Sequence, residues 1–282
     1  MFRSVVVVLV LVAIAAPAAA QPTGKIVFTS VRDGNAEVCI INADGTGFEN
    51  LTDDDAYDDQ PMLSPDGTEV VFVSNRDGNR ELYLMNIANG NVVRLTNTDD
   101  SEIDPVFTAD ASGVIYTLET DKGRDVYELD LVSGESRAIY AGGEGERMAY
   151  QGPGGEMVYV ADVGGNDEIM IEDSGGSRQL TDLPGIDFMP TITPDGEQVF
   201  FVTTREGDYD LYLMNADGTG ERPFLNTETG EGRGAPSPDG GYVAVANEET
   251  GTLDIWIYDM DGNRVLQLTD DAYDNYEPHW SK

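Results

Sequence analysis

The residues of this chain that could do chemistry are overwhelmingly carboxylates. Its 282 residues include 53 Asp and Glu but only one histidine, His279, and one cysteine, Cys39. Neither a Gly-x-Ser-x-Gly elbow nor a glycine-rich phosphate loop occurs. His279 and Cys39 fall in mostly apolar columns of an internal repeat, so we expect both to be packing residues. Nucleophilic catalysis, His-rich metal sites and an intramolecular disulfide framework are therefore excluded, whereas a glycosidase-type carboxylate pair is not.

The net charge of −37 narrows the class of partner. It repels phosphate backbones and anionic lipid headgroups, so nucleic acid is not an expected partner. Two interpretations of the acidic excess stay open. The composition of 32 Asp, 21 Glu and only 3 Lys favours adaptation to high salt, and the alternative is a set of specific cation sites. The apparent calcium-loop beginnings, such as Asp259-x-Asp261-Gly262, match the turn chemistry of the repeat better.

The first 20 residues have the pattern of a secretory signal peptide. Arg3 gives a basic start, residues 5–16 are apolar, and residues 18–20 form an A-x-A cleavage site. The apolar run is shorter than the ~20 residues that a spanning helix needs. We therefore expect cleavage, a mature domain of residues 21–282, no membrane insertion after cleavage, and a periplasmic or secreted location.

An internal repeat of 42–44 residues indicates the architecture. One column holds Phe28, Phe72, Tyr116, Tyr159, Phe201 and Val245. A second column holds Cys39, Tyr83, Tyr127, Met170, Tyr212 and Trp256. A third column marks the start of each unit, at Pro61, Pro105, Met148, Pro190, Gly234 and Pro278.

Each unit predicts four short strands, A to D, separated by Asp-Gly or Asn-Gly turns. In the second unit we expect strands at 62–64, 70–74, 81–85 and 92–95. The fold class is therefore all-β, a six-bladed β-propeller with four-stranded blades. The chain opens at strand B, near residues 24–28, and strand A of residues 278–282 pairs into that N-terminal blade to close the ring.

The repeat resembles the TolB-type propeller family. The resemblance lies in the Ser/Thr-Pro-Asp-Gly turns at 64–67, 193–196 and 237–240, the Leu-Tyr-x-Met-Asn strands at 82–86 and 211–215, and the recurring Leu-Thr pairs. It implies a six-bladed, usually periplasmic propeller that acts through protein contacts. We expect a stand-alone propeller without the N-terminal α/β domain of TolB, so TolB's cell-envelope role is not carried over. The turns at 108–110 and 151–154 depart from the pattern.

Two faces of the expected propeller differ in composition. The face that carries the D–A loops and B–C turns combines acidic runs with aromatic and arginine residues, a composition suited to protein recognition. The candidate partner-binding residues on it are Tyr57, Phe188, Tyr273, Tyr276, Arg32, Arg76 and Arg205. The alternative is that its tyrosines only cap the interfaces between blades.

A candidate metal site lies where the D–A loops meet the axis. Three residues before the third column stand Asp58, Glu102, Gly145, Asp187, Glu231 and Asn275. The four carboxylates and the amide are oxygen ligands of the kind that Ca²⁺ or Mg²⁺ prefers, with Gly145 leaving a gap. The alternative is a hydrated channel whose acids pair with Arg147 and Arg233.

These patterns together predict an exported, non-enzymatic, monomeric propeller that binds a protein partner of unknown identity through its D–A/B–C face. Two alternatives remain. One is a propeller carbohydrate-active enzyme of lyase or glycosidase type, which the shortage of His and Lys bases disfavours. The other is a divalent-cation-binding structural protein of the cell envelope.

Overall fold

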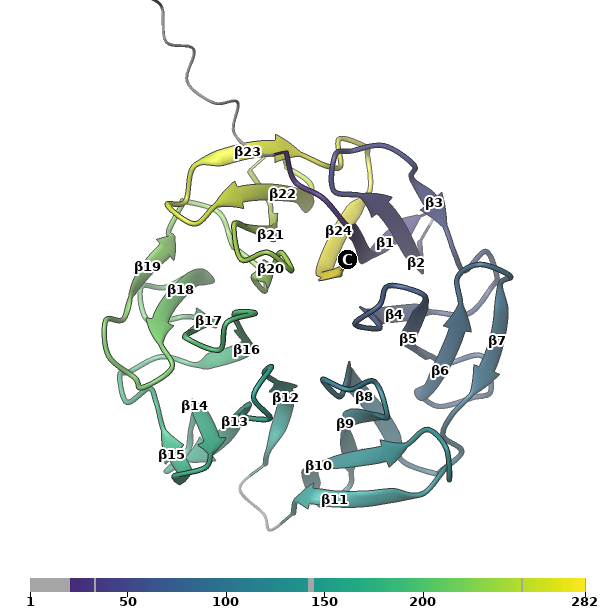
Figure 1. The fold of residues 1–282 in the computed structure, drawn as a ribbon, viewed down its shortest axis with the longest axis horizontal. Coiled ribbons are helices and arrows are strands. Elements are labelled where there is room, and N and C mark those ends of the chain that lie inside the picture. The colour runs from purple at the N-terminus through teal and green to yellow at the C-terminus, as the bar shows by residue number, and fades with distance from the viewer. Residues whose placement is uncertain (1–20, 33, 142–144, 250, 282) are drawn as a thin grey trace, which may run out of the picture.

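The computed structural model describes residues 21–32, 34–141, 145–249 and 251–281, so the expected signal peptide lies outside the described residues. Six four-stranded antiparallel sheets stand around a central axis (Figure 1). This arrangement confirms the six-bladed β-propeller. The described residues contain no helix, and so none that is long and apolar enough to cross a membrane.

The strands of each blade run from the axis outward in the order A to D. Blade 1 consists of β24 (Asp274–Ser281), β1 (Lys25–Arg32), β2 (Asn35–Asn42) and β3 (Glu49–Asn50). Blade 2 consists of β4 (Asp58–Leu63), β5 (Glu69–Ser74), β6 (Glu81–Asn86) and β7 (Asn91–Arg94). Blade 3 consists of β8 (Ser101–Phe107), β9 (Gly113–Thr120), β10 (Gly123–Asp130) and β11 (Ser136–Tyr140).

The other three blades repeat this plan. Blade 4 consists of β12 (Arg147–Gln151), β13 (Met157–Val163), β14 (Asn166–Asp173) and β15 (Gly176–Gln179). Blade 5 consists of β16 (Asp187–Ile192), β17 (Gln198–Thr203), β18 (Asp210–Asn215) and β19 (Arg222–Leu225). Blade 6 consists of β20 (Ala235–Pro236), β21 (Tyr242–Asn247), β22 (Asp254–Asp259) and β23 (Arg264–Gln267).

The first two sequence columns are cross-strand neighbours in every blade. Strands B and C pair so that Phe72 faces Tyr83 in blade 2, and the matching pair occupies the same place in the other five blades. These pairs fill the space between blades, because a twisted sheet buries both faces against its neighbours in the ring. The two columns are therefore confirmed residue by residue.

The expected bounds of strand A were wrong. In blade 2 it begins at Asp58 rather than Met62, and in blade 1 it begins at Asp274 rather than Pro278. The proline of the third column lies inside the strand, at a β-bulge where the pairing register shifts. Proline has no backbone N–H to donate to the hydrogen-bond ladder of the sheet, so it is tolerated at a bulge. For the same reason, the sequence pattern alone places it at the start of the strand.

The bulge also corrects the third column in blade 4. Positive φ angles mark the residue before the bulge proline, as at Gln60 (53°) and Asp104 (53°), and in blade 4 the residue with this conformation is Met148 (51°). The third-column residue of blade 4 is therefore Ala149, not Met148. The third column therefore moves by one residue in blade 4. The residue three places before it is then Glu146 instead of Gly145.

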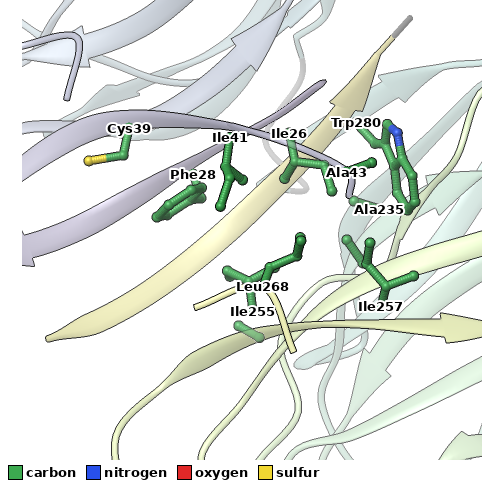
Figure 2. Packing of buried hydrophobic residues seen from close by; sticks show 12 residues of the cluster. Ile26, Phe28, Cys39, Ile41, Ala43, Ala235, Ile255, Ile257, Leu268 and Trp280 are labelled. Carbon is green, nitrogen blue, oxygen red and sulfur yellow. The ribbon is translucent and has the colours of Figure 1, made fainter. Parts of the chain in front are cut away.

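Closure of the ring joins the two ends of the described chain. Strand β24 pairs antiparallel with β1, from Lys25 opposite Ser281 to Val31 opposite Asp274. Trp280 of β24 is buried with Ile26 between blades 1 and 6, where it faces Ile257 of β22 (Figure 2). Its indole N–H donates to the Thr23 carbonyl at 2.8 Å. A C-terminal strand thus completes the first blade, as expected.

We predict that removing residues 278–282 opens the ring. The deletion exposes one edge of β1 and removes Trp280 from the interface between blades 1 and 6. The shortened protein is therefore expected to aggregate. The single change Trp280→Ala is expected to lower the free energy of unfolding by about 3–5 kcal/mol. Size-exclusion chromatography and urea unfolding are the measurements.

Trp256→Ala is the matched control, because Trp256 is only partly buried on β22. We expect a smaller loss of stability from this change. A monomeric deletion product with an unchanged melting temperature would show that β24 does not close the ring.

Candidate functional site

An acidic ring surrounds the D–A mouth of the channel. In five blades the ring residue stands two places before the positive-φ position, and in blade 6 Glu231 holds the equivalent place in the repeat; the ring residues are Asp58, Glu102, Glu146, Asp187, Glu231 and Asn275. Asp58, Glu102, Asp187 and Asn275 are fully buried and Glu231 nearly so. Sequence reasoning found five of them and missed Glu146, because the bulge hid the register of blade 4.

Five of the ring residues form hydrogen bonds with nearby side chains. Asp187 accepts from the Arg205 guanidinium at 3.1 Å, and Glu102 accepts from the Thr98 hydroxyl at 2.6 Å. Asn275 donates to Asp271 at 3.0 Å. One oxygen of each ring residue except Asp187 has no hydrogen-bond partner among the described residues. These oxygens are acceptors left open beside the mouth.

The predicted metal site has no geometric support. Among the described residues, no three His, Cys, Asp or Glu side chains lie close enough together to hold a metal ion. The ring residues are brought to one mouth but not into one cluster. Of the two arginines expected to pair with them, Arg147 instead pairs with Asp167 on β14. A Ca²⁺ or Mg²⁺ site at the ring stays a prediction.

The three arginines predicted to bind a partner hold the D–A face together. Arg76 pairs with Asp58 at 2.8 Å and lies over the Tyr83 ring, 4.9 Å from its centroid. Arg205 pairs with Asp187 and Glu221 in the same way. Each pair neutralises a carboxylate that burial would otherwise make costly. Direct contact of these arginines with a partner stays a prediction.

Arg32 departs from this pattern because Cys39 replaces the aromatic residue of the second column. The Arg32 guanidinium lies 4.7 Å from the ring centroids of both Phe48 and Tyr273 and pairs with Asp271 at 2.6 Å. The Cys39 thiol is buried, and burial raises its pKa to about 11. Cys39 is therefore a packing residue rather than a nucleophile.

The predicted aromatic residues lie at the D–A face but are partly committed to packing. The Tyr57 and Tyr276 hydroxyls hydrogen-bond to each other at 3.1 Å across blades 2 and 1. Phe188 packs edge-on against Tyr209, with ring centroids 5.6 Å apart. All four side chains are only partly buried or exposed, so each retains surface for a partner while bracing its loop.

Sequence reasoning missed three exposed apolar residues in the D–A loop and the B–C turn of blade 5. Leu183 and Ile186 of the D–A loop are 50% and 47% exposed, and Tyr209 of the B–C turn is 54% exposed. The Ile186 backbone hydrogen-bonds to Thr204, which ties the loop to the turn. Gly185 permits this approach, since a Cβ there would lie 2.8 Å from the Arg205 backbone. We call Leu183, Ile186 and Tyr209 the blade 5 patch.

The middle of the channel is narrow and lined by polar side chains. Gln60, Asp104, Arg233 and Glu277 line an axial cavity of about 10 Å³, room for about one water molecule. Gln60 and Asp104 hydrogen-bond to each other at 2.9 and 3.2 Å. Burial and the nearby Asp59 raise the pKa of Glu277 to about 7, and Arg233 opposes this rise. These polar residues lie between the two mouths of the channel.

The opposite mouth, between the A–B turns, is apolar. A pocket of about 330 Å³ opens there and is lined by Met62, Tyr150, His279 and Trp280, among others. The His279 Nδ1 accepts from the Leu63 N–H at 3.1 Å. Burial and Arg233 lower the pKa of His279 to about 3. His279 is therefore a neutral, hydrogen-bonded packing residue at physiological pH.

We predict that Glu231→Gln stabilises the protein above neutral pH. Burial raises the pKa of Glu231 from its ordinary 4.5 to about 7. The folded state therefore binds the Glu231 proton more tightly than the unfolded state does. The contribution of Glu231 to stability is highest below pH 4.5 and is lost as the pH rises through 7. The amide removes this penalty, so urea unfolding at pH 8 is expected to show a gain of about 2 kcal/mol.

The control for this change is Glu228→Gln, an exposed acid in the same loop. Both variants are to be measured in molar salt, where the Debye length is ~3 Å and general repulsion is screened. An unchanged slope of stability against pH for Glu231→Gln would contradict the assignment of a buried, protonated Glu231.

Comparison with known proteins agrees with this architecture. An uncharacterized protein of Agrobacterium fabrum is 29% identical over 133 residues, which cover 45% of this chain and 44% of that protein. The Tol-Pal system protein TolB of Anaeromyxobacter dehalogenans is 28% identical over 115 residues, covering 40% of this chain and 26% of that protein. The chain thus matches less than half the length of these curated relatives.

A solved structure extends the likeness to the whole fold. The crystal structure of TolB from Acinetobacter baumannii superposes with a TM-score of 0.83 at 19% identity, over 93% of this chain and 67% of that one. The family model described as the TolB beta propeller domain matches residues 3–176, more than half of the chain. With the repeat columns and the six blades, this match shows that the chain belongs to the TolB beta propeller domain family.

Proposed function

We propose that this protein is a periplasmic or secreted, non-enzymatic, monomeric propeller that binds a protein partner through its D–A/B–C face. The observation that carries the proposal is the blade 5 patch, three exposed apolar residues on a face otherwise dominated by acids. Apolar anchors inside a polar rim are the usual anatomy of a protein interface.

Charge indicates the chemistry of the partner. Asp182, Glu206 and Asp208 lie in the same loop and turn as the patch, and the acidic ring beside it keeps several unpaired oxygens. A contact surface rich in Lys or Arg around an apolar anchor complements this face and is steered toward it. The partner we propose is therefore a protein with a basic, partly apolar contact surface.

Family membership supports the same function. One relative carries the name Tol-Pal system protein TolB, and the family resemblance implies action through protein contacts in the periplasm. The neutral, packed His279 and the buried Cys39 offer no general base or nucleophile at either mouth. These residues support a binding role over a hydrolytic one.

We assign the excess of acidic residues to adaptation to high salt. The 53 acidic residues far outnumber the 16 basic ones, so at low ionic strength the acidic residues repel one another. The spread of Asp and Glu over every blade, with only 3 Lys in the chain, favours this assignment over specific cation sites.

We predict that the blade 5 patch carries partner affinity. The wild-type protein is immobilised, incubated with envelope extract at matched salt, and the captured chain is identified, purified and titrated by calorimetry. Tyr209→Ala is expected to weaken its binding about 30-fold, as for a hot-spot tyrosine. Ile186→Arg is expected to weaken it further by adding repulsion toward a basic partner.

Val132→Arg is the matched control, because Val132 is 93% exposed on a C–D turn of the opposite face. Equal affinity of wild type and Tyr209→Ala, or equal loss in Val132→Arg, would contradict the proposed face. Size-exclusion light scattering of the unbound protein tests the monomer.

We predict that stability rises steeply from millimolar to molar monovalent salt, with NaCl and KCl acting alike. The cause is screening of repulsion among the surface acids, which depends on ionic strength and not on ion identity. Urea unfolding at graded salt is the measurement. A flat response to monovalent salt together with a jump at micromolar Ca²⁺ would refute salt adaptation and favour a specific cation site.

A further inference from the structure

The A–B mouth has the size and lining of a small-molecule site. Its pocket of about 330 Å³ lies within the usual range for ligand pockets and is walled by Met62, Val106, Tyr150, Ile192 and Trp280. Prolines of several A–B turns form its rim. The axial cavity next along the channel holds about one water molecule, and the pocket opens to the A–B face.

An unpaired carboxylate, that of Glu156, lies next to this pocket, in a neighbouring groove. The Glu156 side chain approaches Gly152, Gly154 and Gly196 so closely that a Cβ at any of them would lie less than 3.0 Å from its carboxylate oxygens. Gly152 itself lines the pocket. Among the described residues, no cation or hydrogen-bond donor pairs with the Glu156 carboxylate. The three glycines thus leave space for the Glu156 carboxylate, which has no positively charged partner among the described residues.

A second anion lies next to the first. Asp195, Glu156 and Pro153 line a neighbouring groove on the same face, and Pro153 also lines the pocket. The Thr193 hydroxyl donates to Asp195 at 2.6 Å, and this bond holds the Asp195 pKa below its ordinary value. The rim beside blades 4 and 5 is therefore negative at neutral pH.

We propose that the A–B mouth binds a small organic cation, whose apolar body fills the pocket and whose ammonium group pairs with Glu156 and Asp195. The lining residues among the described ones include no Lys or Arg, and His279 is neutral, so an anionic ligand finds no counter-charge. This site is on the face opposite the proposed protein interface and is independent of it.

Three six-carbon probes that differ only in their head group test the proposal. They are n-hexylammonium, hexan-1-ol and hexanoate, titrated into protein carrying ¹³C-methyl methionine. The Met62 methyl resonance, assigned with Met62→Leu, is expected to shift saturably with hexylammonium. Hexanol is expected to bind about tenfold more weakly, and hexanoate not at all, because a paired charge is worth roughly a factor of ten.

Variants separate the two halves of the site. Glu156→Gln is expected to weaken hexylammonium about tenfold and to leave hexanol unchanged. Glu197→Gln is the control, an exposed acid of the same A–B turn as Asp195. Ala109→Trp, at an exposed lining position, is expected to abolish binding of both probes, whereas Val132→Trp on the same face leaves it intact.

Three results would overturn the proposal. They are the absence of a saturable Met62 shift with hexylammonium, binding of hexanoate as tight as that of hexylammonium, and binding that survives Ala109→Trp. Urea unfolding of each variant verifies that it is folded before the titration.

Discussion

The antiparallel pairing of β24 with β1 is the contact on which the rest of the structure depends. Without it the first blade lacks its inner strand, and the pocket loses the wall that His279 and Trp280 provide. Closure also removes the sheet edges that an open array would expose. Both mouths of the channel exist only because two segments about 250 residues apart in the chain share one sheet.

The bulge in strand A determines which residues face the channel. At five blades a non-glycine residue takes a φ near +50° before the bulge, a conformation that costs of order 1–3 kcal/mol unless the surroundings enforce it. In three of these blades the positive-φ residue, Gln60, Asp104 or Glu277, lines the axial cavity, and the residue two places before it belongs to the acidic ring. Glu102 of blade 3 is buried by this geometry, and burial raises its pKa to about 7.

The channel has two chemically different ends. The D–A mouth is acidic, beside an exposed apolar patch, which suits a basic protein surface. The A–B mouth is an apolar pocket next to the Glu156 and Asp195 carboxylates, which suits a small cation. The polar cluster around Arg233 and Glu277 separates them, so occupancy of one mouth does not require passage through the other.

The sequence by itself determined the blade number, the pairing of Phe72 with Tyr83 and its counterparts, and the strand that closes the ring, because strand periodicity and turn residues are local properties. Only the tertiary structure decided the position of the bulge, and with it the exchange of Gly145 for Glu146 in the acidic ring. It also decided that Arg76 and Arg205 bind buried carboxylates, and that Leu183 stays exposed. Side-chain partners and exposure depend on segments far apart in the chain, so no single repeat unit contains that information.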